Sequence, residues 1–543
     1  MRAVIPFLKS PAARKLGFSL LLGVFLIVGS IASLQTGLML DDNTEQLTFR
    51  TITGAVKSLI LGHPEEFSRL QSYWNRYYGI GLYAVAYPFQ VLFQPYLART
   101  LGVDSETALL FARRPVVFLL FVISVVVFYR CARFFIRERS IAIAISMAYA
   151  AYPYLFGHAM INIKDSPFMS VYLVCTYLSL RLVKCHLRES ADSFRRDIAG
   201  LAFATAALVS IRIPGLMILV QYAFTFGLAD RSKLDARPAS AKFLLWPNLV
   251  LFSALLIPLV VLAYPAVWIN PLREVFAAVK YMGWYPQPGC TLTWGQCMKP
   301  YATPTYLSGW LVVKLPVLIL IGVAFVPFTL RKIVRDPFQR IAYLTLLFGS
   351  LYVLVAIVAL RARAYDETRQ LLFIYPLLFL LGMTAIYFAS RRLALTAALL
   401  SFVIFICDQV HLHPYQYVYF NETARFFNVD RLFETDYWGT SGREHASLLG
   451  HDLREMKGLT CLYADPNVLY RPFIDPRICV EPLNILYNEY RPKNGFVLVI
   501  TCSPSSPNRF TVPPNCYQLS AITRTLPPSN RKITMSAAYY CSE

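Results

Sequence analysis

The chain has 543 residues, of which 56% are hydrophobic and only 15% are charged. Soluble domains keep charged residues near about a quarter of the chain, so this composition excludes a single soluble core. The formal net charge of +21 would suggest nucleic-acid binding in a soluble protein, but here the basic residues flank apolar stretches and have a membrane explanation.

Apolar stretches of membrane-spanning length recur along the chain and are separated by short polar connections. Because each can cross about 30 Å of hydrocarbon, we predict an α-helical polytopic membrane protein with about eleven transmembrane helices. The fifth and sixth are short and meet at Arg212 and Pro214. The predicted spans are residues 17–35, 115–134, 141–157, 166–183, 197–211, 214–229, 244–266, 307–330, 341–360, 371–389 and 393–410.

The distribution of basic residues predicts the orientation of these helices. The first span has no small-residue cleavage site before the polar segment that begins at Asp41, so we expect a retained signal anchor. Basic residues before this span and in alternate connections after it mark the cytoplasmic face, which includes the N-terminus. Three segments then lie outside the cytoplasm: a first loop at 36–114, residues 267–306 and everything after His411.

The composition divides the chain into two predicted domains. Residues 1–410 form the transmembrane domain that would hold the catalytic site, and residues 411–543 form an extracytoplasmic C-terminal domain. In the latter, a helical pattern at 444–456 and short apolar runs at 459–463 and 496–500 predict a small α/β fold.

Seven of the eleven cysteines fall in the segments predicted to lie outside, where they are free to oxidise. Proximity suggests disulfides between Cys290 and Cys297 and between Cys502 and Cys516, although spacing alone does not settle the pairing. No CxxC or HExxH spacing indicates zinc, so any metal site stays unknown from the sequence.

Three aspartates are candidates for acid–base chemistry. Asp41 and Asp42 directly follow the first span, at the outer membrane surface, where a carboxylate could deprotonate an acceptor hydroxyl or hold a cation. Asp165 lies in the short connection between the third and fourth spans, which places it at the same depth. The alternatives are solvated flanking charge for the pair, and for Asp165 a helix-capping role or an ion pair with Lys164.

Two cations interrupt apolar spans. Arg212 and Lys314 each lie within a stretch where a charge costs about 2.5–3.5 kcal/mol on insertion scales, so each should face a partner or a cavity. An anionic lipid phosphate would suit both, and snorkelling to the membrane interface is the alternative.

A third group of basic residues lies in a predicted outer connection, against the positive-inside rule. Arg363 and Arg369, with Arg361 beside them, suit a phosphate held at the outer leaflet. Pairing with Asp366 and Glu367 would explain them equally well.

At these residues the sequence resembles the GT-C superfamily of polyprenyl-phosphate-sugar glycosyltransferases, and within it bacterial family 39 proteins, which are protein O-mannosyltransferase-like, and the aminoarabinose transferase of lipid A. In the resemblance, Asp41 matches the first-loop aspartate that engages the acceptor, and Asp165 matches the second acidic position. The usual Asp-Glu pair is here Asp41-Asp42, which leaves open which of the two is the base. The matching strings are LMLDDNTEQ, RYYGIG, HAMINIKDSPF, TPTYLSGWLVVKLP, DETRQLLFIYP, HPYQYVYFNE and FETDYWGTSGRE.

The resemblance implies a hexosyl- or pentosyltransferase of the inner or plasma membrane. It would move a sugar from an undecaprenyl or dolichyl phosphate carrier to a lipid, glycan or protein acceptor on the extracytoplasmic face. Lys164, Arg212, Lys314, Arg363 and Arg369 would then bind the lipid phosphate. No cofactor is identified, and a divalent cation stays open. The alternatives are a transporter or flippase of lipid-linked glycans, although no repeat relates the two halves, and a scaffold or receptor.

Overall fold

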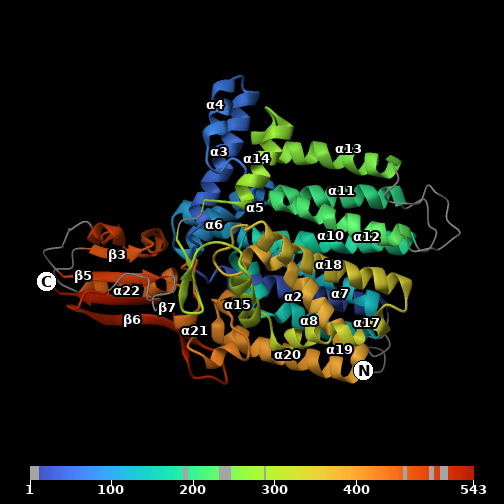
Figure 1. Cartoon of the computed structure of the whole chain (residues 1–543). Coiled ribbons are helices and arrows are strands. Elements are labelled where there is room, and N and C mark those ends of the chain that lie inside the picture. Colours follow the sequence, from blue (N-terminus) through green and yellow to red (C-terminus); the bar gives the residue numbers. More distant parts are fainter. Residues whose placement is uncertain are drawn as a thin grey trace.

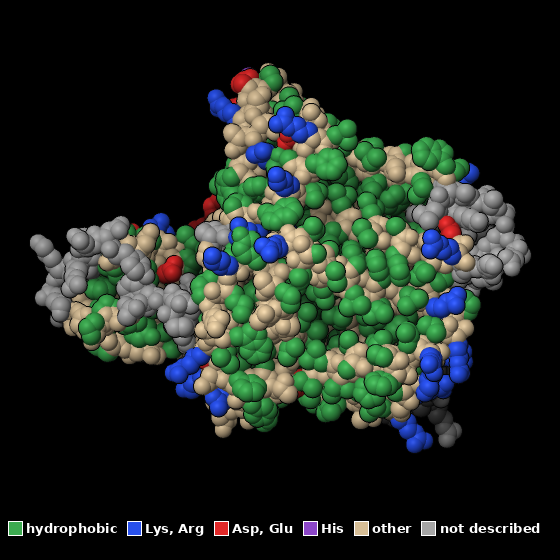
Figure 2. Space-filling model, in the orientation of Figure 1, with side chains coloured by type: hydrophobic (Ala, Val, Ile, Leu, Met, Phe, Trp, Pro, Cys, Tyr) green, Lys and Arg blue, Asp and Glu red, His purple; other side chains and the backbone are tan. Residues whose placement is uncertain are grey.

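The computed structural model describes residues 11–186, 194–231, 246–286, 289–455, 461–487, 495–501 and 512–542. Long helices lie alongside one another in a helical body, and a small β-sheet stands beyond one end of it (Figure 1). The hydrophobic band over the middle of this body is nearly free of charged side chains on the face shown in Figure 2. These are the features of a multi-pass α-helical membrane protein.

Seven helical segments in the described ranges are long and apolar enough to span a membrane. Two bent helix pairs raise this number to nine if each counts as one span, so the predicted eleven spans are not confirmed. Helix α2 (Pro11–Ser33), the predicted signal anchor, has a shorter apolar stretch, and α11 (Phe194–Ile211) is outside the seven. The seven segments are Ser105–Phe135, Asp165–Cys185, Ile213–Arg231, Trp246–Ala263, Pro337–Ala359, Arg369–Ala389 and Arg391–Leu412.

The two bent pairs replace the straight spans predicted at 141–157 and 307–330. Helices α8 (Arg139–Ala151) and α9 (Pro153–Ile161) meet at an angle of 55°, and α15 (Pro304–Lys314) and α16 (Val317–Ala324) meet at 118°. A proline stands at each break, where it has no N–H for the helical ladder and keeps the preceding residue extended. The remaining helices of the body are α7 (Arg114–Phe135), α10 (Asp165–His186), α12 (Ile218–Arg231), α13 (Trp246–Ala263), the short α17 (Val326–Ile333), α18 (Pro337–Ala359), α19 (Tyr375–Ala389) and α20 (Arg391–Leu412).

The first loop is itself helical. Helices α3 and α4 project from the side of the body, near α14, in Figure 1. Leu47 and Ile60 of α3 are exposed, as suits a helix that lies at a membrane interface. This region comprises α3 (Asp42–Ile60), α4 (Pro64–Arg69), α5 (Gly81–Leu101), α6 (Ser105–Ala112) and, from the later outer segment, α14 (Pro271–Gly283) with the hairpin β1 (Thr291–Thr293) and β2 (Gln296–Met298).

The C-terminal region is the small α/β fold that the sequence predicted. Its sheet has the order β4-β3-β5-β7-β6, in which β3 runs parallel to β4 and β5, and β7 runs antiparallel to β5 and β6. The predicted helix at 444–456 is α22, which contacts β6. The elements are α21 (Val429–Leu432), α22 (Gly442–Glu455), β3 (Cys461–Asp465), β4 (Cys479–Pro482), β5 (Phe496–Thr501), β6 (Cys516–Thr525) and β7 (Lys532–Cys541).

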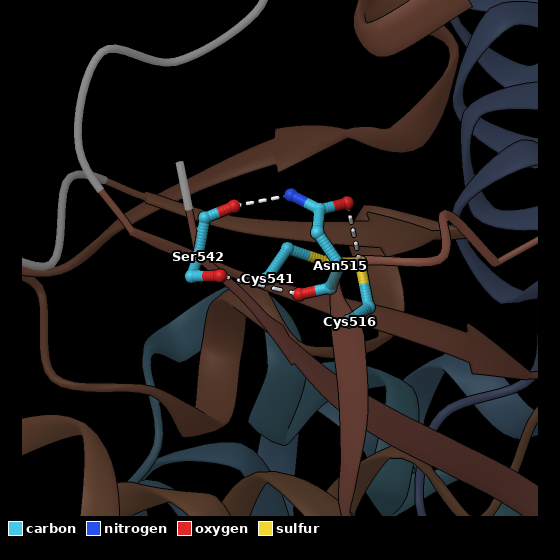
Figure 3. Close-up of a disulfide and its surroundings, with 4 residues drawn as sticks. All are labelled: Asn515, Cys516, Cys541 and Ser542. Atoms are coloured by element: carbon cyan, nitrogen blue, oxygen red, sulfur yellow. Dashed lines mark hydrogen bonds between the residues drawn. A yellow bond between two sulfur atoms is a disulfide. The ribbon is translucent and has the colours of Figure 1, made fainter.

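The disulfides confirm one predicted pair and correct the other. Cys290 is bonded to Cys297, as predicted. Cys516, however, is bonded to Cys541 and not to Cys502, which lies outside the described residues (Figure 3). The reason is the sheet register, because β6 and β7 place Cys516 and Cys541 directly opposite each other. A further disulfide joins Cys461 and Cys479 across β3 and β4.

Candidate functional site

A cavity of about 430 Å³ lies where the helical body, the first loop and the C-terminal region meet. Its wall includes Asp465 and Pro466 at the end of β3, so the C-terminal region helps to enclose it. Acidic and basic side chains from segments far apart in the sequence face the same space. The charged residues that line the cavity are Asp41, Lys164, Arg212, Asp366, Arg369, Glu434 and Asp465.

Asp41 supplies a carboxylate to this cavity from the turn just before α3. Its side chain is 39% exposed, and one of its oxygens lies 3.8 Å from Nη1 of Arg369. Burial raises the pKa of Asp41, although the Arg369 guanidinium opposes the shift. A carboxyl group whose pKa is raised toward neutrality is a stronger general base than an ordinary aspartate. Asp41 is therefore suited to the predicted role of a general base.

Asp42 is turned away from the cavity and holds the fold together. Its side chain is 2% exposed and forms an ion pair with Arg113 and, at 3.5 Å, with Arg114. It also accepts a hydrogen bond of 2.8 Å from the backbone N–H of Met39. Because these donors occupy both carboxylate oxygens, the predicted catalytic role for Asp42 is replaced by an anchoring role next to Asp41.

Lys164 reaches the cavity from the connection between α9 and α10. Its ammonium lies 2.7 Å from Glu45 of α3 and 3.7 Å from the ring centre of Tyr78. Burial lowers the pKa of Lys164, while Glu45 and Asp41 oppose that shift. The expected pairing of Lys164 with Asp165 is not what the structure shows, since Glu45 takes that place.

Asp165 lies behind the cavity wall and contacts two of its arginines. The side chain is 2% exposed, pairs with Arg212, and lies 3.5 Å from Nη1 of Arg369. Its backbone N–H donates to Asn162, so the start of α10 is capped by Asn162 and not by Asp165. Asp165 is therefore placed to orient two cations, not to touch a ligand in this cavity.

The guanidinium of Arg369 faces three carboxylates at the cavity. Nη2 of Arg369 lies 2.9 Å from Asp366, whereas Nη1 faces Asp41 and Asp165. The alternative of pairing with Asp366 is thus realised for Arg369, while its side chain still lines the cavity. One guanidinium consequently connects an acidic residue of the first loop with one of α10.

Two of the predicted phosphate-binding residues lie away from the cavity. Lys314, at the end of α15, is fully buried and lies 2.7 Å from the equally buried Glu367. Arg363 lies over the ring of Tyr301, 4.5 Å from its centre. Neither residue lines the cavity, so the structure does not bring them to the other predicted phosphate ligands, and their assignment stays a prediction. The sequence could not reveal the partner of Lys314, because Glu367 is brought to it only by the fold.

Sequence reasoning assigned no role to the aromatic wall of the cavity. Tyr365, Tyr437 and Trp438 line it, the last two within the string FETDYWGTSGRE. The backbone of this string is tied to the first loop, because Leu40 donates to the carbonyl of Trp438 at 3.1 Å and Gly37 donates to that of Thr440 at 3.0 Å. In the sequence, the signal that could have indicated this wall is the pair of aromatic residues directly after Asp436.

In the described ranges, no group of three His, Cys, Asp or Glu side chains is arranged to hold a metal ion. The divalent cation left open by the sequence stays untested.

No protein-family model matches the chain, and no curated protein matches it in sequence. The structure is similar to that of ArnT from Cupriavidus metallidurans bound to undecaprenyl phosphate, at 13% identity and a TM-score of 0.45, covering 96% of this chain and 98% of that chain. A structure of the same protein in the apo state gives 13% identity, a TM-score of 0.43, and coverage of 97% and 98%. The predicted resemblance to the GT-C superfamily stays a prediction. At this identity and TM-score the similarity assigns no substrate, and the cavity residues carry the functional argument.

Proposed function

We propose that this protein is a membrane glycosyltransferase that takes a sugar from a polyprenyl-phosphate carrier and transfers it to an acceptor on the extracytoplasmic face. The observation that supports this best is the juxtaposition in one cavity of the Asp41 carboxylate with Lys164, Arg212 and Arg369. Transfer of this kind needs a base for the acceptor and cations for the leaving phosphate.

The cavity residues divide the chemistry between them. Asp41 accepts the proton of an acceptor hydroxyl while the oxygen of that hydroxyl attacks the anomeric carbon of the sugar. The bond between that carbon and the phosphate oxygen breaks, and the polyprenyl phosphate leaves with the electron pair. Attack on the side opposite the leaving group inverts the anomeric centre.

The cations act on the leaving group. Arg212 and Arg369 are oriented by Asp165, and Lys164 is oriented by Glu45, so all three charges are in place before a ligand arrives. Preorganised charge costs no reorganisation during the reaction, which is the main advantage of such a site. The undecaprenyl phosphate named for one ArnT structure is the carrier we propose for this chain.

The site also predicts where the protein works. A donor anchored in lipid brings its phosphate to the membrane surface, and the cavity lies at the end of the helical body that bears the C-terminal sheet. We place this end outside the cytoplasm in the inner or plasma membrane, because the basic connections mark the opposite end as cytoplasmic.

The test uses the full-length protein in detergent and in liposomes. Binding of undecaprenyl phosphate is measured by titration calorimetry, and the envelope lipids, glycans and proteins of cells with and without the protein are compared by mass spectrometry. We expect saturable binding and one sugar modification that depends on the protein. Binding of undecaprenyl phosphate without any dependent modification, together with movement of a lipid-linked glycan across liposomes, would favour the flippase alternative instead.

A further inference from the structure

A tight turn at residues 436–441 of the C-terminal region borders the cavity and is closed by the side chain of Asp436. This residue is fully buried and does not itself line the cavity. Its carboxylate accepts hydrogen bonds from the hydroxyl of Tyr417, from the backbone N–H of Thr440 at 2.8 Å and from that of Ser441 at 3.1 Å. One buried carboxylate therefore holds the two ends of the turn together.

The backbone at Asp436 shows that this turn is held in an unusual conformation. Its φ is 32°, in the left-handed region that residues other than glycine adopt uncommonly. Such a conformation persists only where the surrounding contacts fix it, and strained residues of this kind gather at functional sites. Tyr437 and Trp438, the next two residues, lie in the cavity wall. The strain at Asp436 therefore points to a function for the geometry of the turn.

The turn holds the segment that leads into Asp41. The N–H of Gly37 donates to the carbonyl of Thr440 at 3.0 Å, and the N–H of Leu40 donates to that of Trp438 at 3.1 Å. Gly37 lies so close to the turn that a Cβ atom there would overlap the carbonyl oxygen of Thr440. Because only glycine permits this approach, the backbone before the proposed base is fitted directly against the turn.

The turn is also tied to the helical body. Tyr417, which donates to the Asp436 carboxylate, belongs to η6 (Gln416–Val418), and η6 packs on α9. Helix α9 leads into the connection that carries Lys164. A base must lie within hydrogen-bond reach of its hydroxyl, and a misplacement of about 1 Å can cost about 100-fold in rate. The contacts of this turn are thus suited to fix the base relative to the cations.

We propose that Asp436 is a positioning residue for sugar transfer, and that it sets the place of Asp41 in the cavity through the 436–441 turn. This rests on the proposed function and extends it to a residue that touches neither donor nor acceptor. Asp41 remains the group that accepts the proton. Asp42 and its arginines hold the chain on the other side of Asp41, so loss of Asp436 should displace the base without unfolding the first loop.

The test perturbs the contact from both sides. Asp436→Asn keeps the size of the side chain but leaves one oxygen to accept where the carboxylate has two, and Gly37→Ala adds the Cβ for which the turn has no room. The matched controls are Asp408→Asn, which alters a buried carboxylate away from the cavity, and Gly54→Ala in α3, where a Cβ meets no atom within 4 Å.

Three measurements are made on each full-length protein. Amide hydrogen exchange, read by mass spectrometry, follows the peptide that contains residues 37–40. The kcat of transfer from an undecaprenyl-phosphate sugar is measured in membranes of cells that lack the wild-type protein. Titration calorimetry measures the binding of undecaprenyl phosphate.

We expect both variants to exchange the amide hydrogens of Gly37 and Leu40 faster than wild type and to lower kcat by about tenfold to 100-fold. Undecaprenyl phosphate should bind as in wild type, because the three cations of the cavity are unaltered. The double variant should lose no more kcat than the worse single one, since both changes act on one contact. Neither control should change exchange or kcat, although Asp408→Asn should melt at a lower temperature.

The positioning role is overturned by wild-type exchange at these two amides, by a wild-type kcat in both variants, or by an equal kcat loss in Asp408→Asn. A loss of undecaprenyl phosphate binding in place of kcat would overturn it as well. If Asp436→Asn does not fold, Gly37→Ala against Gly54→Ala decides the question. A wild-type protein that transfers no sugar would instead refute the proposed function itself.

Discussion

The buried pair of Lys314 and Glu367 gives a sharp prediction about stability. Both side chains are fully buried, and the ammonium lies 2.7 Å from the carboxylate. Lys314 ends α15 at the 118° bend, and Glu367 belongs to the loop that carries Arg369 into the cavity. Replacing one partner leaves the other charge buried without compensation, which typically costs about 3–5 kcal/mol.

The perturbation is a double-mutant cycle of Lys314→Met and Glu367→Gln. We expect each single variant to lose about 3–5 kcal/mol and the double variant to recover most of that loss, because it removes both charges from a place where solvating them is expensive. Unfolding in detergent, followed by circular dichroism and by retention of the folded peak in size-exclusion chromatography, measures the losses. The matched control is the exposed pair of Arg50 and Glu106, at 2.8 Å, where about 0–1 kcal/mol is expected. Single variants as stable as those of the exposed pair would refute the reasoning.

Three further predictions concern the site and its orientation. Asp41→Asn should lower transfer by about 100-fold to 10,000-fold with normal expression and should remove the acidic limb of the pH profile, whereas Glu65→Gln, an exposed control, should do neither. Arg369→Gln should weaken undecaprenyl phosphate binding, whereas Arg363→Gln, in the same connection but off the cavity, should not; equal losses would remove Arg369 from the phosphate site. A reporter fused after residue 543 should be active only outside the cytoplasm, and cytoplasmic activity would reverse the proposed topology.

The sequence predicted a helical membrane body, although the predicted eleven spans are not confirmed, because length and hydropathy decide whether a segment can cross a membrane. It missed the breaks at Tyr152 and Leu315, although Pro153 and Pro316 were visible, because a proline can end, kink or merely begin a helix, and tertiary packing decides which. The α/β fold of the C-terminal region was predicted from its local patterns, but the Cys516–Cys541 pairing depended on strand order, which no local pattern contains.

Some of the residues predicted for the candidate site line the cavity, and others do not. Asp41, Lys164, Arg212 and Arg369 do line one cavity, but Asp42, the neighbour of Asp41, points the opposite way. Adjacent residues at the start of a helix face different directions, so a sequence that shows two aspartates cannot show which one reaches the cavity. Lys164 and its partner Glu45, and Arg369 and its partner Asp165, lie far apart in the sequence, and only the fold brings them together.

Asp165 offers the clearest separation of a positioning role from a catalytic one. Asp165→Asn keeps the size of the side chain and removes the charge that faces Arg212 and Arg369. We expect the KM for the lipid-linked donor to rise about tenfold, because two phosphate-facing cations lose their common anchor, while the acidic limb of the pH profile stays where Asp41 sets it. The start of α10 should stay intact, since Asn162 caps it. Steady-state kinetics across pH and a thermal melt of the purified variant measure both effects. Loss of the acidic limb in Asp165→Asn, with the KM unchanged, would move the base from Asp41 to Asp165.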